Sequence, residues 1–180
     1  MKNAISNIWL LGLVASFIFL FSGYLAVTIS YSSAFKMKNE LLSIIEKHRG
    51  ITSNTGESLK SQIPGVSETV KGNLGALQTM NIYLNGSGYK VKGACPVSKK
   101  NEKWYGVKSL EFTKTTGIYE EARKGTKYYY CFSKYDAYGD NNSYYKIKMF
   151  FKMDVPVLGD LFTFNIDGTT DDIFNDKGII

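Results

Sequence analysis

Apolar residues are concentrated near the start of the chain. Residues 8–29 contain no charged side chain, and the next charge after them is Lys36. As a helix with a rise of about 1.5 Å per residue, this stretch is about 33 Å long, enough to cross a hydrocarbon core of about 30 Å. A lone span in lipid must be helical, because each backbone amide has to bond within its own segment. The pattern predicts a transmembrane anchor within residues 1–35.

Aromatic residues mark the two ends of this anchor. Trp9 lies at one end, and Tyr24 and Tyr31 lie near the other, so we predict these three as the membrane interface, where amphipathic rings prefer to lie. The polar leader with Lys2 is also typical of a secretory signal, and the small residues 32–34 would suit cleavage. The apolar stretch is longer than a usual signal core of about 7–15 residues, which favours a retained anchor.

The helix is predicted to continue beyond the membrane over residues 36–49. This segment contains no Gly or Pro, and its apolar residues recur at helical spacing, which places them on one stripe. Gly50 follows Lys47 and Arg49 and indicates the end of the helix. The stripe, which we expect to pack against a globular head, consists of Met37, Leu41, Ile44, Ile45 and His48.

The pattern of the remaining residues, 50–180, predicts one domain. Together with the N-terminal helix, it predicts an α+β fold for the chain. A short second helix is expected over residues 67–85, with Leu77, Asn81 and Leu84 on one face. Residues 144–155 alternate most clearly, with Ile147 and Met149 on the buried face and lysines on the other. The acidic last dozen residues show little pattern, and we expect them to be frayed. An antiparallel meander of about four strands is predicted over residues 104–113, 127–135, 144–155 and 161–167.

Charge is unevenly distributed along the chain. Residues 36–152 carry 20 basic and 10 acidic side chains, whereas residues 153–180 carry six Asp and one Lys. This asymmetry favours contact with an anionic surface or between copies of the chain. A solvated surface that merely keeps the protein soluble is the alternative.

The two cysteines, Cys95 and Cys131, give an indication of the cellular compartment in which the C-terminal domain lies. An even number in a domain outside the cytoplasm favours a disulfide, and two buried free thiols are the alternative. The lysines that follow the span would hold that side in the cytoplasm under the positive-inside rule, but long domains translocate largely regardless of flanking charge. We therefore predict a single-pass protein of the cell membrane with its C-terminal domain outside the cytoplasm.

Candidate catalytic residues are few. His48 is the only histidine and lies on the apolar stripe, where a packing role is expected. Residues 136–142 and 167–172 are rich in oxygen ligands, but they lack the acid spacing of an EF-hand. The sequence contains neither a phosphate-binding loop with its lysine nor a Gly-x-Ser-x-Gly motif. We predict no enzymatic activity, bound metal or cofactor.

Lysines and tyrosines interleave on two of the predicted strands. Rings flanked by lysines can stack on bases or hold another anionic polymer. The plainer interpretation is a core face of rings with lysines facing solvent, under which nucleic acid is not an expected partner. The candidate residues for an anionic partner are Lys127, Tyr128, Tyr130, Tyr144, Lys146 and Lys148.

Two stretches resemble those of type IV pilin-like proteins, and more closely those of the small TadE-like pseudopilins of tight-adherence pilus and secretion clusters. They are residues 17–24 continuing through Tyr31 to residues 38–40, and residues 155–169. Over most of the chain the resemblance is architectural: an apolar helix runs on into an amphipathic half and packs against an antiparallel sheet with a late disulfide. The chain departs from the pilin pattern at Phe17, where an acidic residue would follow a processing Gly12.

The resemblance implies a minor filament subunit or a partner of the assembly platform, with bundled apolar helices and heads facing outward. The first hypothesis is therefore a membrane-anchored, non-enzymatic pilin-like component, whose partners are the bilayer, pilus or secretion proteins and its own copies. The second is a surface binding module whose basic aromatic sheet holds a cell-wall polymer, lipid headgroups or nucleic acid.

Overall fold

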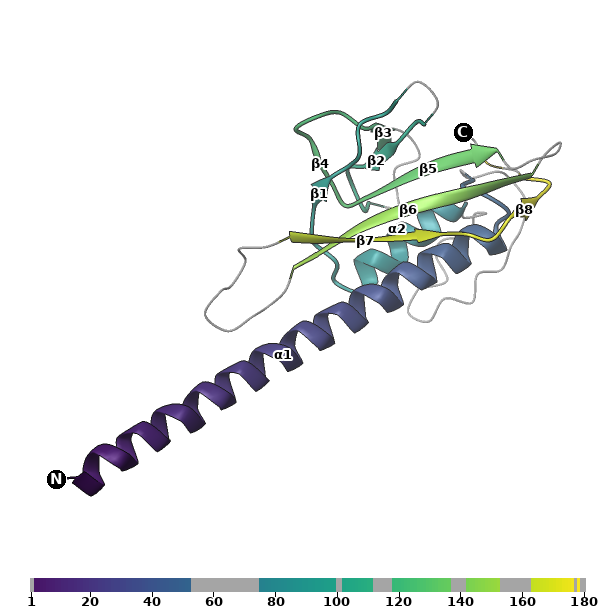
Figure 1. Cartoon of the computed structure of the whole chain (residues 1–180). Coiled ribbons are helices and arrows are strands. Elements are labelled where there is room, and N and C mark those ends of the chain that lie inside the picture. The colour runs from purple at the N-terminus through teal and green to yellow at the C-terminus, as the bar shows by residue number, and fades with distance from the viewer. Residues whose placement is uncertain are drawn as a thin grey trace.

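A long helix leads into a head of antiparallel strands in this computed structural model (Figure 1). The structure describes residues 2–52, 75–99, 102–111, 118–136, 142–152, 163–176 and 178, with only the backbone of residues 2–7. The first helix, α1 (Lys2–Lys47), has 46 residues and is therefore about 69 Å long. Because two helices precede strands that pack against them, the predicted α+β class is confirmed.

The end of α1 is set by Gly50, as predicted. Gly50 adopts a φ of 116°, in the region that favours glycine, and its N–H donates to the Ile45 carbonyl. The hydroxyl of Thr52 then accepts a hydrogen bond of 3.0 Å from the Ala76 N–H, at the first turn of α2 (Ala76–Gly86). This contact holds the start of α2 beside the end of α1. Residues 67–74 of the predicted second helix lie outside the described residues.

The described residues contain eight strands in two antiparallel sheets. The small sheet pairs β1 (Gly93–Ala94) with β4 (Lys127–Tyr128). The large sheet has the order β3-β2-β5-β6-β7, and β8 pairs with one end of β6. Its members are β2 (Tyr105–Val107), β3 (Tyr119–Glu121), β5 (Tyr130–Asp136), β6 (Asn142–Lys152), β7 (Thr163–Thr169) and β8 (Ile173–Phe174).

The predicted antiparallel meander is present, but the described residues contain more strands than the four or so that were predicted. The expected strand over residues 127–135 is divided at Tyr129, whose N–H donates to the Val107 carbonyl, so β4 and β5 belong to different sheets. The strands β1, β3 and β8 were not predicted, because each has only two or three residues and too little alternation to be recognised.

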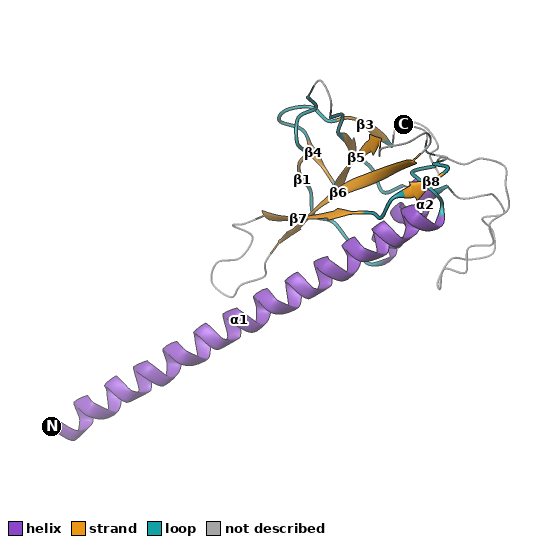
Figure 2. Ribbon diagram, turned by 45° about the vertical axis from the view of Figure 1, so that its right-hand side comes forward, coloured by secondary structure: helices purple, strands orange, loops and turns teal. Residues whose placement is uncertain are grey.

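Both helices cover the same face of the large sheet (Figure 2). The predicted stripe of α1 supplies Leu41, Ile44 and Ile45 to this core, and α2 supplies Leu77 and Leu84. From β6, the alternating residues 145, 147, 149 and 151 are buried in the same core. The amphipathic half of α1 therefore packs as its sequence indicates.

The described residues of the C-terminal segment, up to 176 and 178, are held against the head, which corrects the expectation that this segment is frayed. Asp176 lies against the head and accepts hydrogen bonds from the hydroxyls of Ser143 and Tyr145, the latter at 2.8 Å. It also accepts from the Gly178 N–H and pairs with the ammonium of Lys134, both at 2.8 Å. The pattern looked loose because Asp176 serves as a partner of residues on distant strands and is not a member of a periodic element.

Candidate functional site

The first half of α1 carries a continuous apolar surface, which we call the apolar span (residues 8–29). It stands clear of the head (Figure 1). No side chain of the span is buried, and Leu20, for example, is 73% exposed. The most apolar stretch of the helix has a mean hydropathy of 2.2. By length and composition, this helix can cross a membrane.

Two hydroxyl groups of the span, those of Ser22 and Thr28, are hydrogen-bonded inside the helix. Ser22 donates to the Ile18 carbonyl at 2.8 Å, and Thr28 donates to the Tyr24 carbonyl at 2.9 Å. Such bonds to the preceding turn let a hydroxyl lie in a medium that offers no hydrogen-bonding partner. These two polar side chains are therefore compatible with lipid.

The three predicted interface residues are all exposed, and only Tyr31 reaches the head. Its ring centroid lies 6.3 Å from that of Phe151 on β6 and 6.4 Å from that of Phe35 on α1. Trp9 and Tyr24 project from the free part of the helix. The placement of these rings in a headgroup layer stays a prediction.

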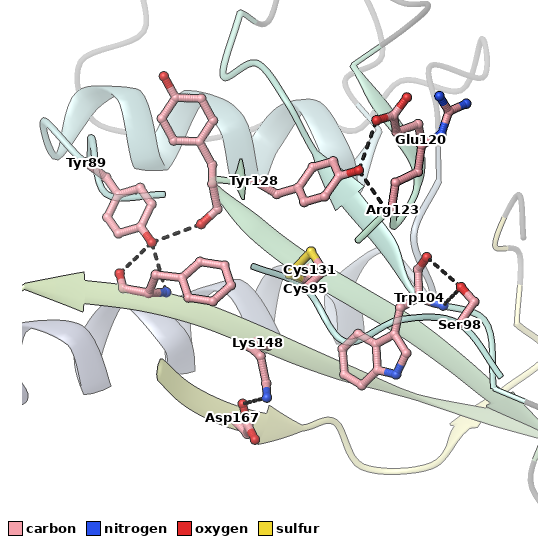
Figure 3. Close-up of a disulfide and its surroundings, with 12 residues drawn as sticks. Tyr89, Cys95, Ser98, Trp104, Glu120, Arg123, Tyr128, Cys131, Lys148 and Asp167 are labelled. Carbon is pink, nitrogen blue, oxygen red and sulfur yellow. Dashed lines mark hydrogen bonds and ion pairs between the residues drawn. A yellow bond between two sulfur atoms is a disulfide. The ribbon is translucent and has the colours of Figure 1, made fainter. Parts of the chain in front are cut away.

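Cys95 and Cys131 form a disulfide over the face of the large sheet that the helices leave open (Figure 3). Alternation along β5 explains the side, since Tyr130 and Phe132 point into the helix-covered core and Cys131 points the other way. A second, smaller core surrounds the bond. We call it the disulfide lobe, and its buried members are Cys95, Trp104, Ala122, Tyr128, Cys131 and Phe150.

Polar contacts at the border of the lobe hold its loops in place (Figure 3). The hydroxyl of Tyr128 donates to the Glu120 carboxylate at 2.9 Å and accepts from the Arg123 N–H at 3.1 Å. The hydroxyl of Tyr89 donates to the Phe150 carbonyl at 2.6 Å, which ties the segment after α2 to β6. Burial raises the pKa of Tyr89, so it remains a neutral donor.

Two of the candidate residues for an anionic partner are inaccessible. Tyr128 lies in the disulfide lobe and Tyr130 lies in the helix-covered core, both fully buried. The hydroxyl of Tyr130 donates to the side-chain carbonyl of Asn81 on α2 at 3.0 Å. These two rings cannot stack on a ligand, because each is enclosed by the protein itself. The hydrogen bond from Tyr130 also explains why a polar residue, Asn81, lies on the buried face of α2.

Three of the other four candidates lie on one face of β6, and Lys127 lies apart from them. On the open face of the large sheet, Tyr144 stacks on Tyr135 with centroids 5.0 Å apart, and the Lys146 ammonium lies 4.3 Å from the centroid of the Tyr135 ring. Lys148 pairs with Asp167 at 3.4 Å, and Lys127 is exposed on β4 in the other sheet. The intramolecular partners of Lys146 and Lys148 favour the plainer interpretation of the pattern, and anionic binding stays a prediction.

The Tyr130→Phe variant tests the buried role. It should lower the free energy of unfolding by about 1–3 kcal/mol, because the buried carbonyl of Asn81 loses its donor. Tyr144→Phe is the matched control and should change stability by about 0.5 kcal/mol or less, since its half-exposed ring keeps its stacking. Urea unfolding of both variants measures the difference. Equal stability of the two would contradict the assignment of Tyr130 to the core.

A carboxylate on the open face was not identified from sequence. Glu102 accepts hydrogen bonds from the Tyr135 hydroxyl and from Nε1 of Trp104, the latter at 2.8 Å. These two hydrogen bonds hold the pKa of Glu102 below its usual value, and the bond from Tyr135 has the larger effect. Burial, together with donation to Glu102, raises the pKa of Tyr135 to about 12. The cluster fixes a loop to the sheet across 33 residues of sequence, a separation that no local pattern reveals.

The remaining ionisable candidates have structural surroundings. His48 is half-buried at the end of α1, and burial followed by repulsion from Lys47 lowers its pKa, which favours the neutral ring. Asp167 and Thr169, from one of the oxygen-rich segments, lie in β7. Residues 137–141 of the other segment lie outside the described residues. Within the described part of the chain, no group of three or more His, Cys, Asp or Glu residues is arranged for a metal ion.

No protein-family model, curated protein or solved structure matches this chain. What the structure shows is a pilin-like shape: a long apolar N-terminal helix whose second half packs against an antiparallel sheet that carries a disulfide. Among the described residues, the apolar span and the outside of the head are exposed.

Proposed function

We propose that this chain is a single-pass membrane protein with its head outside the cytoplasm, and that it serves as a pilin-like subunit or assembly component of a surface filament or secretion system. The apolar span is the observation that carries this proposal, since residues 8–29 are exposed on the same helix that enters the core of the head. A disulfide supports an oxidising compartment for the head. The role proposed is structural rather than enzymatic.

The geometry of α1 supports retention of the anchor. The helix is continuous through residues 32–34, the segment that would suit cleavage by a signal peptidase. Ala34 is only 3% exposed because the head covers it. Cleavage after this residue would remove Ala34 from the core and Tyr31 from its contact with Phe151. Phe17, in place of an acidic residue, argues in the same direction against processing after Gly12.

Fractionation of the full chain tests the anchoring. The protein should remain in membranes after extraction at alkaline pH, and its intact mass should be that of the uncleaved, oxidised chain. Phe17→Lys with Leu20→Lys should release it, because each lysine at the centre of a span costs about 3 kcal/mol. The control is Phe174→Lys, at an exposed position on the head. Release of the unmodified protein at alkaline pH would refute the anchor.

A salt titration separates assembly from the second candidate function. The disulfide lobe and its flanks expose several cations, among them Lys90, Lys92, Arg123, Lys124 and Lys127, which would suit an anionic surface polymer. Retention on such a polymer should fall linearly with the logarithm of salt concentration. Self-association in detergent that does not respond to salt supports the pilin-like role instead.

A further inference from the structure

We propose that the head does not stand away from the bilayer on a stalk but rests on it, with the end of the head nearest the apolar span forming a contact with phospholipid headgroups. The contact face is made by Tyr31, Phe35 and Lys38 of α1, Phe151 of β6 and Phe164 of β7. This inference rests on the proposed anchoring and adds that residues of the sheet, as well as those of the helix, touch the membrane.

The length of free helix between the span and the head is very short. The span ends at Ile29, and the first residue of α1 that the head buries is Ala34. Five residues of helix extend about 7.5 Å. Each headgroup layer is about 5–7 Å thick, since a bilayer of about 40–45 Å encloses a hydrocarbon core of about 30 Å. The head therefore begins within or directly above the headgroup layer.

The described residues at this end of the head include a cluster of aromatic rings. The rings of Tyr31 and Phe151 lie 6.3 Å apart, and Phe151 stacks on Phe164 at 5.7 Å. Phe164 and Phe35 are 38% and 43% exposed, so rings on both the sheet and the helix reach the surface. Tyr rings prefer the headgroup layer, and exposed Phe rings bury their apolar surface at the boundary between headgroups and acyl chains. In water alone, this cluster would leave apolar surface uncovered.

A cation accompanies these rings. The ammonium of Lys38 lies 4.3 Å from the centroid of the Phe35 ring, and Lys36 is exposed one turn before Glu40. Long lysine side chains extend along apolar surface and place their charge among headgroups. Aromatic rings with adjacent ammonium groups therefore fit a phospholipid surface, where phosphate oxygens accept from lysine.

The opposite end of the head provides an internal contrast. Phe164 pairs with Phe151 near the end of β6, whereas Phe174 of β8 pairs with Asn142 at its start. Nine residues of strand separate these positions by about 30 Å. Phe174 is 68% exposed, so it is a second accessible ring on the same sheet at the end away from the span (Figure 1).

Depth measurements on spin-labelled protein test the proposal. The variants Phe164→Cys, Phe174→Cys and Leu20→Cys are each labelled with the native disulfide kept, and reconstituted into vesicles of phosphatidylcholine and phosphatidylglycerol. Power saturation then compares access of oxygen with access of a water-soluble nickel chelate. We expect the label at position 20 to lie deepest. The label at position 164 should show several-fold lower nickel access than the label at position 174.

The three labels also distinguish failure of the headgroup contact from failure of the membrane anchoring. Equal nickel access at positions 164 and 174, with position 20 still deep, would overturn the resting head and leave the anchoring intact. Nickel access at position 20 equal to that at position 174 would overturn the anchoring itself. Should Phe164→Cys fail to fold, Phe35→Cys reports on the same face from α1, and the same comparison with position 174 decides the question.

Discussion

Replacing both cysteines, Cys95→Ser with Cys131→Ser, should lower the free energy of unfolding of the head by about 3–4 kcal/mol. The bond joins residues 36 apart in sequence, and the chain-entropy model gives this magnitude for a loop of that length. The effect should begin in the disulfide lobe, because its core has six buried members among the described residues and the bond supplies two of them. The helix-covered core does not contain either cysteine.

Urea unfolding of the detergent-solubilised full chain measures this loss, with the fluorescence of buried Trp104 as a local probe. A reducing agent should bring the unfolding midpoint of the wild-type protein close to that of the double variant, and should not affect the variant. Hydrogen exchange should show that β1 and β4 lose protection before β5 and β6 do. If reduction leaves the midpoint of the wild-type protein unchanged, the bond does not stabilise the head.

Local periodicity explains which parts of this structure could be predicted. The apolar span and the stripe of α1 repeat over many residues, so their pattern identifies the helix and its buried side without knowledge of the fold. The pairing of Cys95 with Cys131 was the only pairing within the chain that two cysteines allow. The face of β6 followed from simple alternation.

The roles of the tyrosines could not be predicted in the same way. Tyr128 and Tyr130 would share a face of one continuous strand, and lysines beside them suggested a binding surface. Because the strand breaks at Tyr129, the two rings enter separate cores on opposite sides of the large sheet. That break depends on the Val107 carbonyl, which is distant in sequence. Alternation gives the correct face only where the extent of the strand is known.

Asp176 shows the same limitation for a charged residue, because its burial could not be predicted from the local sequence. An Asp in an acidic C-terminal segment with little pattern gives no local sign of burial, yet its side chain is 4% exposed. Its close neighbours include Gly50, where an added Cβ would clash with the Asp176 carboxylate. A glycine that ends α1 thus also makes room for a carboxylate from the other end of the chain. Such a contact depends on the assembled fold.

The Asp176→Asn variant should therefore lower the free energy of unfolding by about 3 kcal/mol at neutral pH. The change removes the charge that pairs with Lys134 and weakens the hydrogen bonds from Ser143 and Tyr145, in a buried position where such losses are costly. Asp167→Asn is the matched control, since that carboxylate also pairs with a lysine but is 64% exposed. It should cost about 1 kcal/mol or less.

The pH dependence of this difference identifies the carboxylate as the cause. Burial alone would raise the pKa of Asp176, but donors from Lys134, Ser143, Gly178 and Tyr145 outweigh it and hold the pKa below its usual value of 3.8. A group whose pKa is lowered by folding stabilises the folded state above its unfolded pKa, and this contribution is lost as the pH falls through the folded pKa. Urea unfolding should therefore show a constant gap between wild type and Asp176→Asn from about pH 5 to 8, which narrows below about pH 4. A gap that persists unchanged at about pH 2–3 would mean that the Asp176→Asn change disturbs packing, and that the ionised carboxylate is not what holds the C-terminal residues to the head.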